Sequence, residues 1–171
     1  ASVFNLKQMA QTMNYLTEHG LLQYSNLASK AESATAKYND LAARIQAAEK
    51  RMAEIAVMKT HIINYVKTKD VYAAYRKAGY SKKYLAEHEP DILLHKAAKK
   101  AFDEQGMQKL PTIKKLQNEY AELLVQKKKD YALYRQARDE MRELLKAKAN
   151  VDRILGDENR TGNTEKEQAQ R

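Results

Sequence analysis

Residues 27–66, LASKAESATAKYNDLAARIQAAEKRMAEIAVMKTHIINYV, carry an apolar stripe whose positions recur in alternating steps of four and three. Lys59 is its single polar interruption. The other members are Leu27, Ala31, Ala34, Tyr38, Leu41, Ile45, Ala48, Met52, Ile55, Ile62 and Val66. A repeat of about 3.5 residues keeps one narrow face of a helix against a partner helix, and alanines allow a close approach. The stretch therefore predicts one half of a coiled coil.

A helix with so thin an apolar stripe is not stable alone in water, so a second helix is expected. The chain supplies one after Pro111, which suits a first helical turn because its missing N–H would have no partner there. Its apolar spacing is interrupted by three polar residues, Lys127, Asp130 and Lys148. The apolar positions are Ile113, Leu116, Tyr120, Leu123, Tyr134, Ala137, Met141, Leu144, Val151 and Leu155. Two such helices predict an antiparallel hairpin.

We therefore expect an all-α fold, because helix-forming residues dominate and Gly and Pro are few. Gly20 is predicted to end the first helix, and Ser25 to cap the second. The expected elements are a short helix over 3–18 at the base, a long helix over 25–78, a helical cap over 79–110 and a long helix over 111–155. Together they form one elongated domain, 1–156, followed by a polar tail, 157–171, that we predict to be disordered.

The stretch between the long helices, GYSKKYLAEHEPDILLHKAAKKAFDEQG at 79–106, begins and ends on glycine. Ser81 is placed to start one short helix and Pro90 another, and Gly106 to close the second. The apolar residues of this cap predict a small core of its own. They are Tyr80, Tyr84, Leu85, Ile92, Leu93, Leu94 and Phe102.

Positive charge gathers near this cap. The whole chain has a net charge of +9, and residues 67–102 hold nine cations against four carboxylates, a local +5. Lysine and arginine interspersed with tyrosines suit contacts to phosphates and bases. A solvated helical surface with buried tyrosines is the alternative interpretation. The candidate residues for binding nucleic acid or a protein partner are Arg76, Lys77, Lys82, Lys83, Lys96, Lys99 and Lys100.

Catalytic and metal chemistry find little support in the sequence. The chain has no cysteine, which excludes thiolate sites and disulfides. His88 and His95 lie seven residues apart across a proline, whereas metal-binding histidines on a helix usually lie four apart. We expect no catalytic residue, no metal and no cofactor. The sequence also lacks a membrane-spanning apolar run and a secretion signal, so we expect no membrane insertion and a cytoplasmic location.

Four successive segments of the chain resemble the C-terminal region of relaxase/mobilisation nucleases, which start the transfer of integrative conjugative elements in gut bacteria. They are VFNLKQMAQTMNYLTEHGLL, AAEKRMAEIAVMKTHIINYVKT, YRKAGYSKKYLAEHEPDILLHKAAKKAFDE and YRQARDEMRELLKAKANVDRILG. The resemblance implies a parent protein whose N-terminal module holds a nucleophilic tyrosine and a metal-binding histidine cluster. Neither is carried over to these residues, which contain no His-x-His pair.

The resemblance thus implies a non-catalytic domain that is accessory to DNA mobilisation. Its expected partners are DNA or proteins of the relaxosome and conjugation machinery, with the chain as a monomer or weak homodimer. A structural coiled-coil spacer or oligomerisation module without nucleic-acid binding is the alternative.

Overall fold

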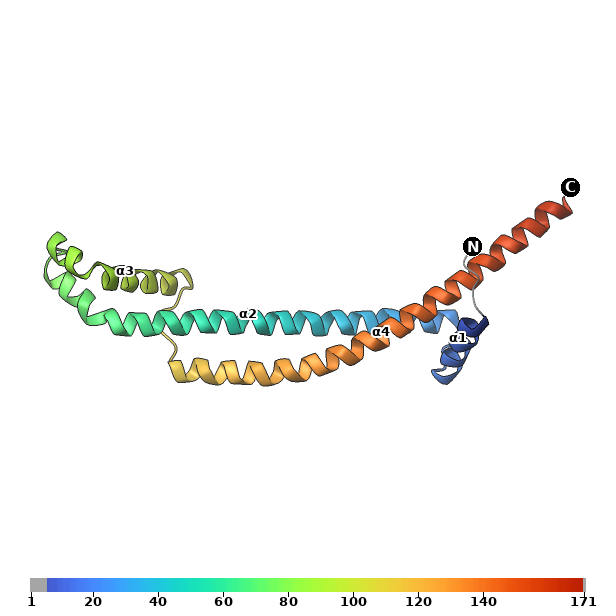
Figure 1. The fold of residues 1–171 in the computed structure, drawn as a ribbon, viewed down its shortest axis with the longest axis horizontal. Helices are drawn as coiled ribbons and strands as arrows, with labels where there is room; N and C mark the ends of the chain where they lie inside the picture. The colour runs from blue at the N-terminus through green and yellow to red at the C-terminus, as the bar shows by residue number, and fades with distance from the viewer. Residues whose placement is uncertain (1–5, 171) are drawn as a thin grey trace. The chain divides into compact units, whose positions relative to one another are not determined.

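The computed structural model describes residues 6–170, except for the side chains of 157–167. It consists of four helices: α1 (Leu6–Glu18), α2 (Tyr24–Lys77), α3 (Lys82–Glu104) and α4 (Ile113–Ala169) (Figure 1). The predicted all-α hairpin is confirmed, since α2 packs against α4 and no strand occurs in the part of the chain described. No helix there is apolar over a length that would span a bilayer.

The chain divides into two compact units, each containing a segment of α2 and a segment of α4. Unit 1 comprises Ala1–Ile45 and Lys129–Arg171, and unit 2 comprises Gln46–Lys128. The sequence predicted a single domain over 1–156, which stays a prediction. The predicted helix over 3–18 is observed from Leu6, and residues 3–5 lie outside the described part.

Unit 1 is built from α1 and the antiparallel segments of α2 and α4. Its buried core consists of Leu16, Leu21, Leu27, Ala31, Ala34, Leu144 and Ala147. Two polar pairs fix the register of α2 against α4. The hydroxyls of Tyr38 and Tyr134 are 2.9 Å apart, and Arg44 lies 3.1 Å from the buried carboxylate of Asp130. Asp130, which interrupted the apolar pattern in the sequence, therefore has a structural role inside the seam.

Unit 2 adds α3 to the pair formed by α2 and α4. Its buried core combines residues from all three helices: Ile55, Met58, Ile62, Ala98, Phe102 and Leu116. The seam of α2 stays buried or half-buried as far as Ile62, but Val66 is 66% exposed. Its assignment to the seam was therefore wrong. Beyond Ile62 the packed face of α2 shifts to Tyr65 and Thr68, because α3 returns along that side (Figure 1).

Three helices end in the same hydrogen-bonding arrangement, the Schellman motif, around a glycine with positive φ. In α2, Gly79 donates its N–H to the carbonyl of Arg76, and Tyr80 donates to that of Tyr75, both at 3.0 Å. Equivalent pairs of bonds surround Gly20 and Gly106. The φ of Gly79 is 65°, a conformation that an L side chain adopts only at a cost. These glycines therefore set where the chain leaves each helix, as the sequence predicted.

The starts of the helices differ from the predictions. Helix α2 begins at Tyr24, where the carbonyl of Gln23 accepts the first bonds, so Ser25 lies inside the first turn and is not the cap. Helix α4 begins at Ile113, and the hydroxyl of Thr112 accepts a hydrogen bond from the N–H of Lys115 at 3.1 Å. Thr112 takes the capping role because its hydroxyl can accept an otherwise unpaired N–H, so Pro111 lies just outside the first turn.

Helix α4 also continues to Ala169, where the sequence predicted a disordered tail from residue 157. Extending an existing helix costs far less than starting one, because each added residue gains a hydrogen bond. Glu, Lys, Gln and Ala near the end of the chain are good helix formers and favour this extension.

We predict that Gly79→Ala destabilises the protein by about 1 kcal/mol, because alanine must adopt the left-handed conformation of the Schellman motif. Gly156→Ala is the matched control. Gly156 lies within α4 with ordinary helical φ and open space around it, so alanine should leave stability unchanged or slightly higher. Urea denaturation followed by circular dichroism measures both. Equal midpoints for the two variants would contradict the assigned role of Gly79.

Candidate nucleic-acid interface

The end of unit 2 is held together by a stack of aromatic rings between α2 and α3. His95 lies between Tyr65 and Tyr72, with ring centroids 4.5 and 4.4 Å away and nearly parallel planes. Its Nδ1 is 2.9 Å from the hydroxyl of Thr68, which itself donates to the carbonyl of Asn64 at 2.6 Å. The hydroxyl therefore accepts from Nδ1–H. This buried stack fixes the position of α3 on α2.

The environment of His95 favours its neutral form. Burial lowers the pKa of His95 below the ordinary value of 6.5, and the positive charge of Lys99 lowers it further, against an opposing hydrogen bond to the backbone of Tyr65. Below about pH 6.5 the unfolded chain takes up a proton that the folded chain resists. His95 therefore contributes stability above that pH, and the contribution is lost as the pH falls.

We predict that the melting temperature of His95→Phe falls less than that of the natural chain when the pH is lowered from about 7.5 to about 5.5, the range in which a histidine titrates. Phenylalanine retains a ring between Tyr65 and Tyr72 but has no proton to gain. Thermal melts at several pH values give the comparison. Parallel curves for the variant and the natural chain would show that His95 does not control this dependence.

The first part of α3 is oriented by a kink. His88 has non-helical backbone angles (φ −128°, ψ 23°), and Pro90 follows within the same helix. Proline cannot donate a backbone hydrogen bond, and its ring crowds the preceding turn, so the helix bends before it. The ring of His88 packs on Tyr84, whose hydroxyl donates to the carbonyl of Val71 on α2 at 3.3 Å. The two predicted short helices thus correspond to the two parts of α3, which are separated by the non-helical residue His88, and each part is tied to α2.

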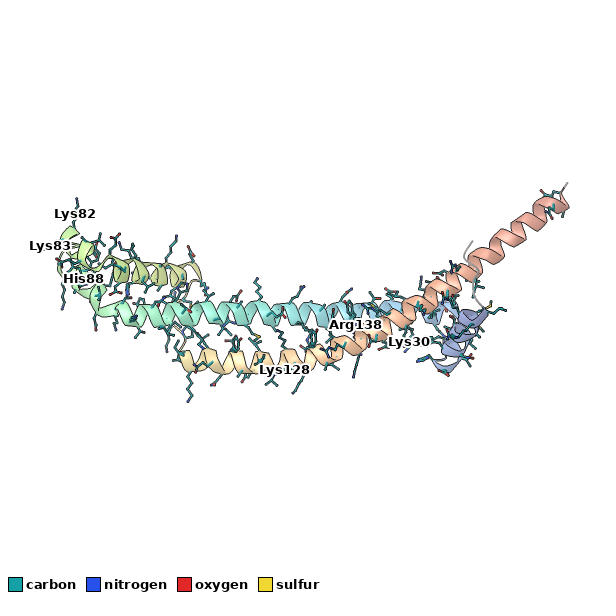
Figure 2. The ribbon with its side chains drawn as sticks, viewed as in Figure 1. Lys30, Lys82, Lys83, His88, Lys128 and Arg138 are labelled. Carbon is teal, nitrogen blue, oxygen red and sulfur yellow. The ribbon has the colours of Figure 1, made fainter. Side chains whose placement is uncertain are left out.

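Four of the predicted basic residues flank the turn from α2 to α3. Arg76 and Lys77 occupy the last turn of α2, and Lys82 and Lys83 begin α3. Figure 2 shows Lys82 and Lys83 at this turn, directed away from both helices. We call these four residues the turn cluster. Arg76 and Lys77 also line a surface depression together with Ala73 and Tyr80.

The other three predicted residues, Lys96, Lys99 and Lys100, share one face of the second part of α3, and we call them the α3 row. The α3 row lies beyond the kink at His88, whereas Lys82 and Lys83 lie before it. The ammonium of Lys96 is 5.7 Å from the ring centre of Tyr75, and Lys100 forms an exposed ion pair with Glu104 at 3.8 Å. The structure therefore places the seven candidates in two groups.

The turn cluster has no acidic partner, a property that it shares with most lysines of unit 2 but not with Arg51, Lys100 or Lys127. Nearer the middle of α2, Arg51 binds Glu119 through two hydrogen bonds of 2.6 and 3.1 Å, which lower the pKa of that carboxyl. Lys127 similarly pairs with Glu49. Within the described part of the chain, no carboxylate forms an ion pair with any member of the turn cluster. These four charges remain available to an external anion.

The predicted core of the cap is only partly confirmed. Ile92 and Phe102 are buried, and Phe102 belongs to the core that unit 2 forms with α2 and α4 instead of a separate core of the cap. Leu93 and Leu94 are exposed, and Tyr80 is 56% exposed. Their placement in a core was wrong, because α3 can bury only one of its faces on α2 and because Tyr80 lies in the turn before α3.

The aromatic stack was missed by sequence reasoning, which considered His95 only as an unlikely metal ligand. The spacing of Tyr65, Thr68, Tyr72 and Tyr75 in steps of three and four was the available signal, because it continues the packed face of α2. No three His, Asp or Glu side chains among those described come together as a metal site.

Comparisons with protein-family models, with curated proteins and with solved structures return no significant match.

Proposed function

We propose that this chain is a non-catalytic helical domain that contacts DNA as an accessory to mobilisation, within a protein of the relaxase type. The observation that carries the proposal is the turn cluster, four exposed cations without acidic partners around one turn. The resemblance of four sequence segments to the C-terminal region of relaxases supports the choice of DNA as the polyanion. Docking of conjugation proteins on the same surface is the related possibility.

The two groups of basic residues suit a nucleic-acid backbone. The turn cluster and the α3 row lie on opposite sides of the kink at His88, so one strand can contact cations at more than one phosphate. Lysine and arginine at such positions bind phosphates through charge, and each neutralised phosphate releases counterions. Binding of this kind has little sequence preference and weakens steeply with salt.

We predict that the natural chain binds labelled oligonucleotides in fluorescence anisotropy and loses affinity steeply across a salt series. Charge reversal at Lys82, Lys83, Lys99 and Lys100 should reduce affinity by at least about tenfold at low salt and flatten the salt dependence. The reversal of four exposed lysines elsewhere, Lys30, Lys37, Lys128 and Lys129, is the control with the same change in net charge. It should reduce affinity far less.

Two results would contradict the proposal. One is unchanged affinity after reversal of the four proposed lysines. The other is the same loss in both variants, since this would indicate a general effect of net charge and no defined surface.

A second candidate function, a structural spacer, is favoured by the packing of α2 against α4 within one chain. In both units the seam residues of α2 are buried by the same polypeptide, so the hairpin needs no second copy to cover them. This function predicts a monomer in light scattering and no binding to DNA at any salt concentration. A stable dimer would instead favour the oligomerisation module.

A further inference from the structure

We infer that Tyr80 is a stacking platform for an unpaired base, and that the turn cluster holds the phosphates of the same strand. The inference rests on the proposed function and deepens it by naming single-stranded DNA as the ligand of the turn between α2 and α3. It depends on the exposure of Tyr80, on its fixed backbone and on its basic surroundings.

The exposure of Tyr80 is unusual for its position. In each Schellman motif of this chain, the residue after the glycine is placed to pack against the residue five positions before it. Leu21 fills this position after Gly20 and is 4% exposed, and Met107 fills it after Gly106 and packs on the core of unit 2. Tyr80 occupies the same position after Gly79 yet is 56% exposed. A large aromatic ring is thus presented to solvent where the other two motifs bury an apolar side chain.

The ring of Tyr80 is also held in place. The N–H of Tyr80 donates to the carbonyl of Tyr75, and the two rings meet edge to face, with centroids 5.2 Å apart and planes at 84°. In such a contact at least one face of Tyr80 is not covered by Tyr75. Tyr75 is itself buried and contacts Tyr72 and Tyr84, so the ring of Tyr80 is supported by the aromatic stack.

The backbone of Tyr80 is the only non-glycine one with positive φ, 60°, among residues 6–170. Such a conformation is disfavoured for a bulky residue and is maintained only where surrounding bonds enforce it. The backbone that carries the ring therefore has little freedom to lose when a ligand binds.

The surroundings of Tyr80 suit a nucleotide. Arg76 and Lys77 line the same surface depression as the tyrosine, and Lys82 and Lys83 follow it within three residues. The carboxylates nearest in sequence are Asp70 and Glu87, and no ion pair joins either of them to these cations. An aromatic face beside unpaired cations provides both contacts of a nucleotide, stacking for the base and charge for the phosphate.

This combination distinguishes single strands from duplexes. In a duplex each base is stacked between its neighbours and cannot lie on the ring of Tyr80, whereas every unpaired base has a free face. Duplex DNA can use the phosphate contacts alone. The expected preference is therefore for single-stranded DNA, with little dependence on sequence.

The test measures the affinity of the whole chain for a labelled oligothymidine and for a duplex of matched length. Tyr80→Ala should weaken binding to the single strand by about 5- to 100-fold and binding to the duplex less than about twofold. Tyr80→Phe keeps the ring and should bind like the natural chain. Tyr80→Gly accepts the positive φ without strain, so it should fold at least as well and still lose single-strand affinity. Tyr120→Ala, which removes another exposed tyrosine of unit 2, is the control and should have no effect.

A direct readout of stacking is the fluorescence of a 2-aminopurine base within the oligonucleotide, which should be quenched by the natural chain and by Tyr80→Phe but not by Tyr80→Ala. Equal affinity for both ligands, with no effect of Tyr80→Ala or Tyr80→Gly, would overturn this inference and leave the proposed function standing. Absence of binding to either ligand at low salt would overturn both. A preference for single-stranded RNA over DNA would overturn the choice of DNA.

Discussion

The burial of a narrow apolar stripe on α2 is the constraint on which the remaining structure depends. A helix from Tyr24 to Lys77 offers too little apolar surface to be stable alone, so every part of its stripe needs a covering helix. In unit 1 the cover comes from α1 and α4, with alanines that let the helices approach closely. In unit 2 it comes from α4 and α3 together. The turn from which α3 returns along α2 carries the four cations of the turn cluster.

Packing and charge have separate roles in unit 2. The buried side of α3 contributes Ile92, His95, Ala98 and Phe102, and these residues fix the helix without any ion pair. Ionic contacts between helices occur instead near Arg51 and Glu119 and are partly exposed, so each stabilises the fold only slightly. Because aromatic and aliphatic contacts hold the end of unit 2, the cations of the turn cluster are not needed for stability. Their lack of acidic partners is therefore compatible with a binding role.

Sequence periodicity could predict the elements of this fold but only part of the candidate site. The steps of four and three from Leu27 to Ile62, together with Gly20, Gly79 and Gly106, were enough for the helices and for the C-terminal ends of α1, α2 and α3, because both signals are local. The caps of α2 and α4 and the C-terminal end of α4 were not predicted correctly. Val66 and Tyr80 were misplaced because their burial depends on which side of α2 the returning α3 covers, which local spacing does not specify. The exposure of the seven basic candidates could be expected from their charge. Their separation into two groups depends on the kink at His88 and on the helix that continues beyond it.

The aromatic stack of unit 2 has a spectroscopic consequence. The chain contains no tryptophan, and five of its eleven tyrosines lie between residues 65 and 84. Tyr65 and Tyr72 enclose a histidine ring, and Tyr75 contacts Tyr72, Tyr80 and Tyr84. Rings fixed in such asymmetric contacts give rise to circular dichroism in the near ultraviolet, whereas the helical backbone absorbs in the far ultraviolet. The junction of α2 and α3 thus contributes to an intrinsic optical signal, to which the stacked rings of Tyr38 and Tyr134 in unit 1 also contribute. A partial loss of this signal with an unchanged far-ultraviolet spectrum would accompany loosening of the aromatic contacts while the helices themselves remain intact.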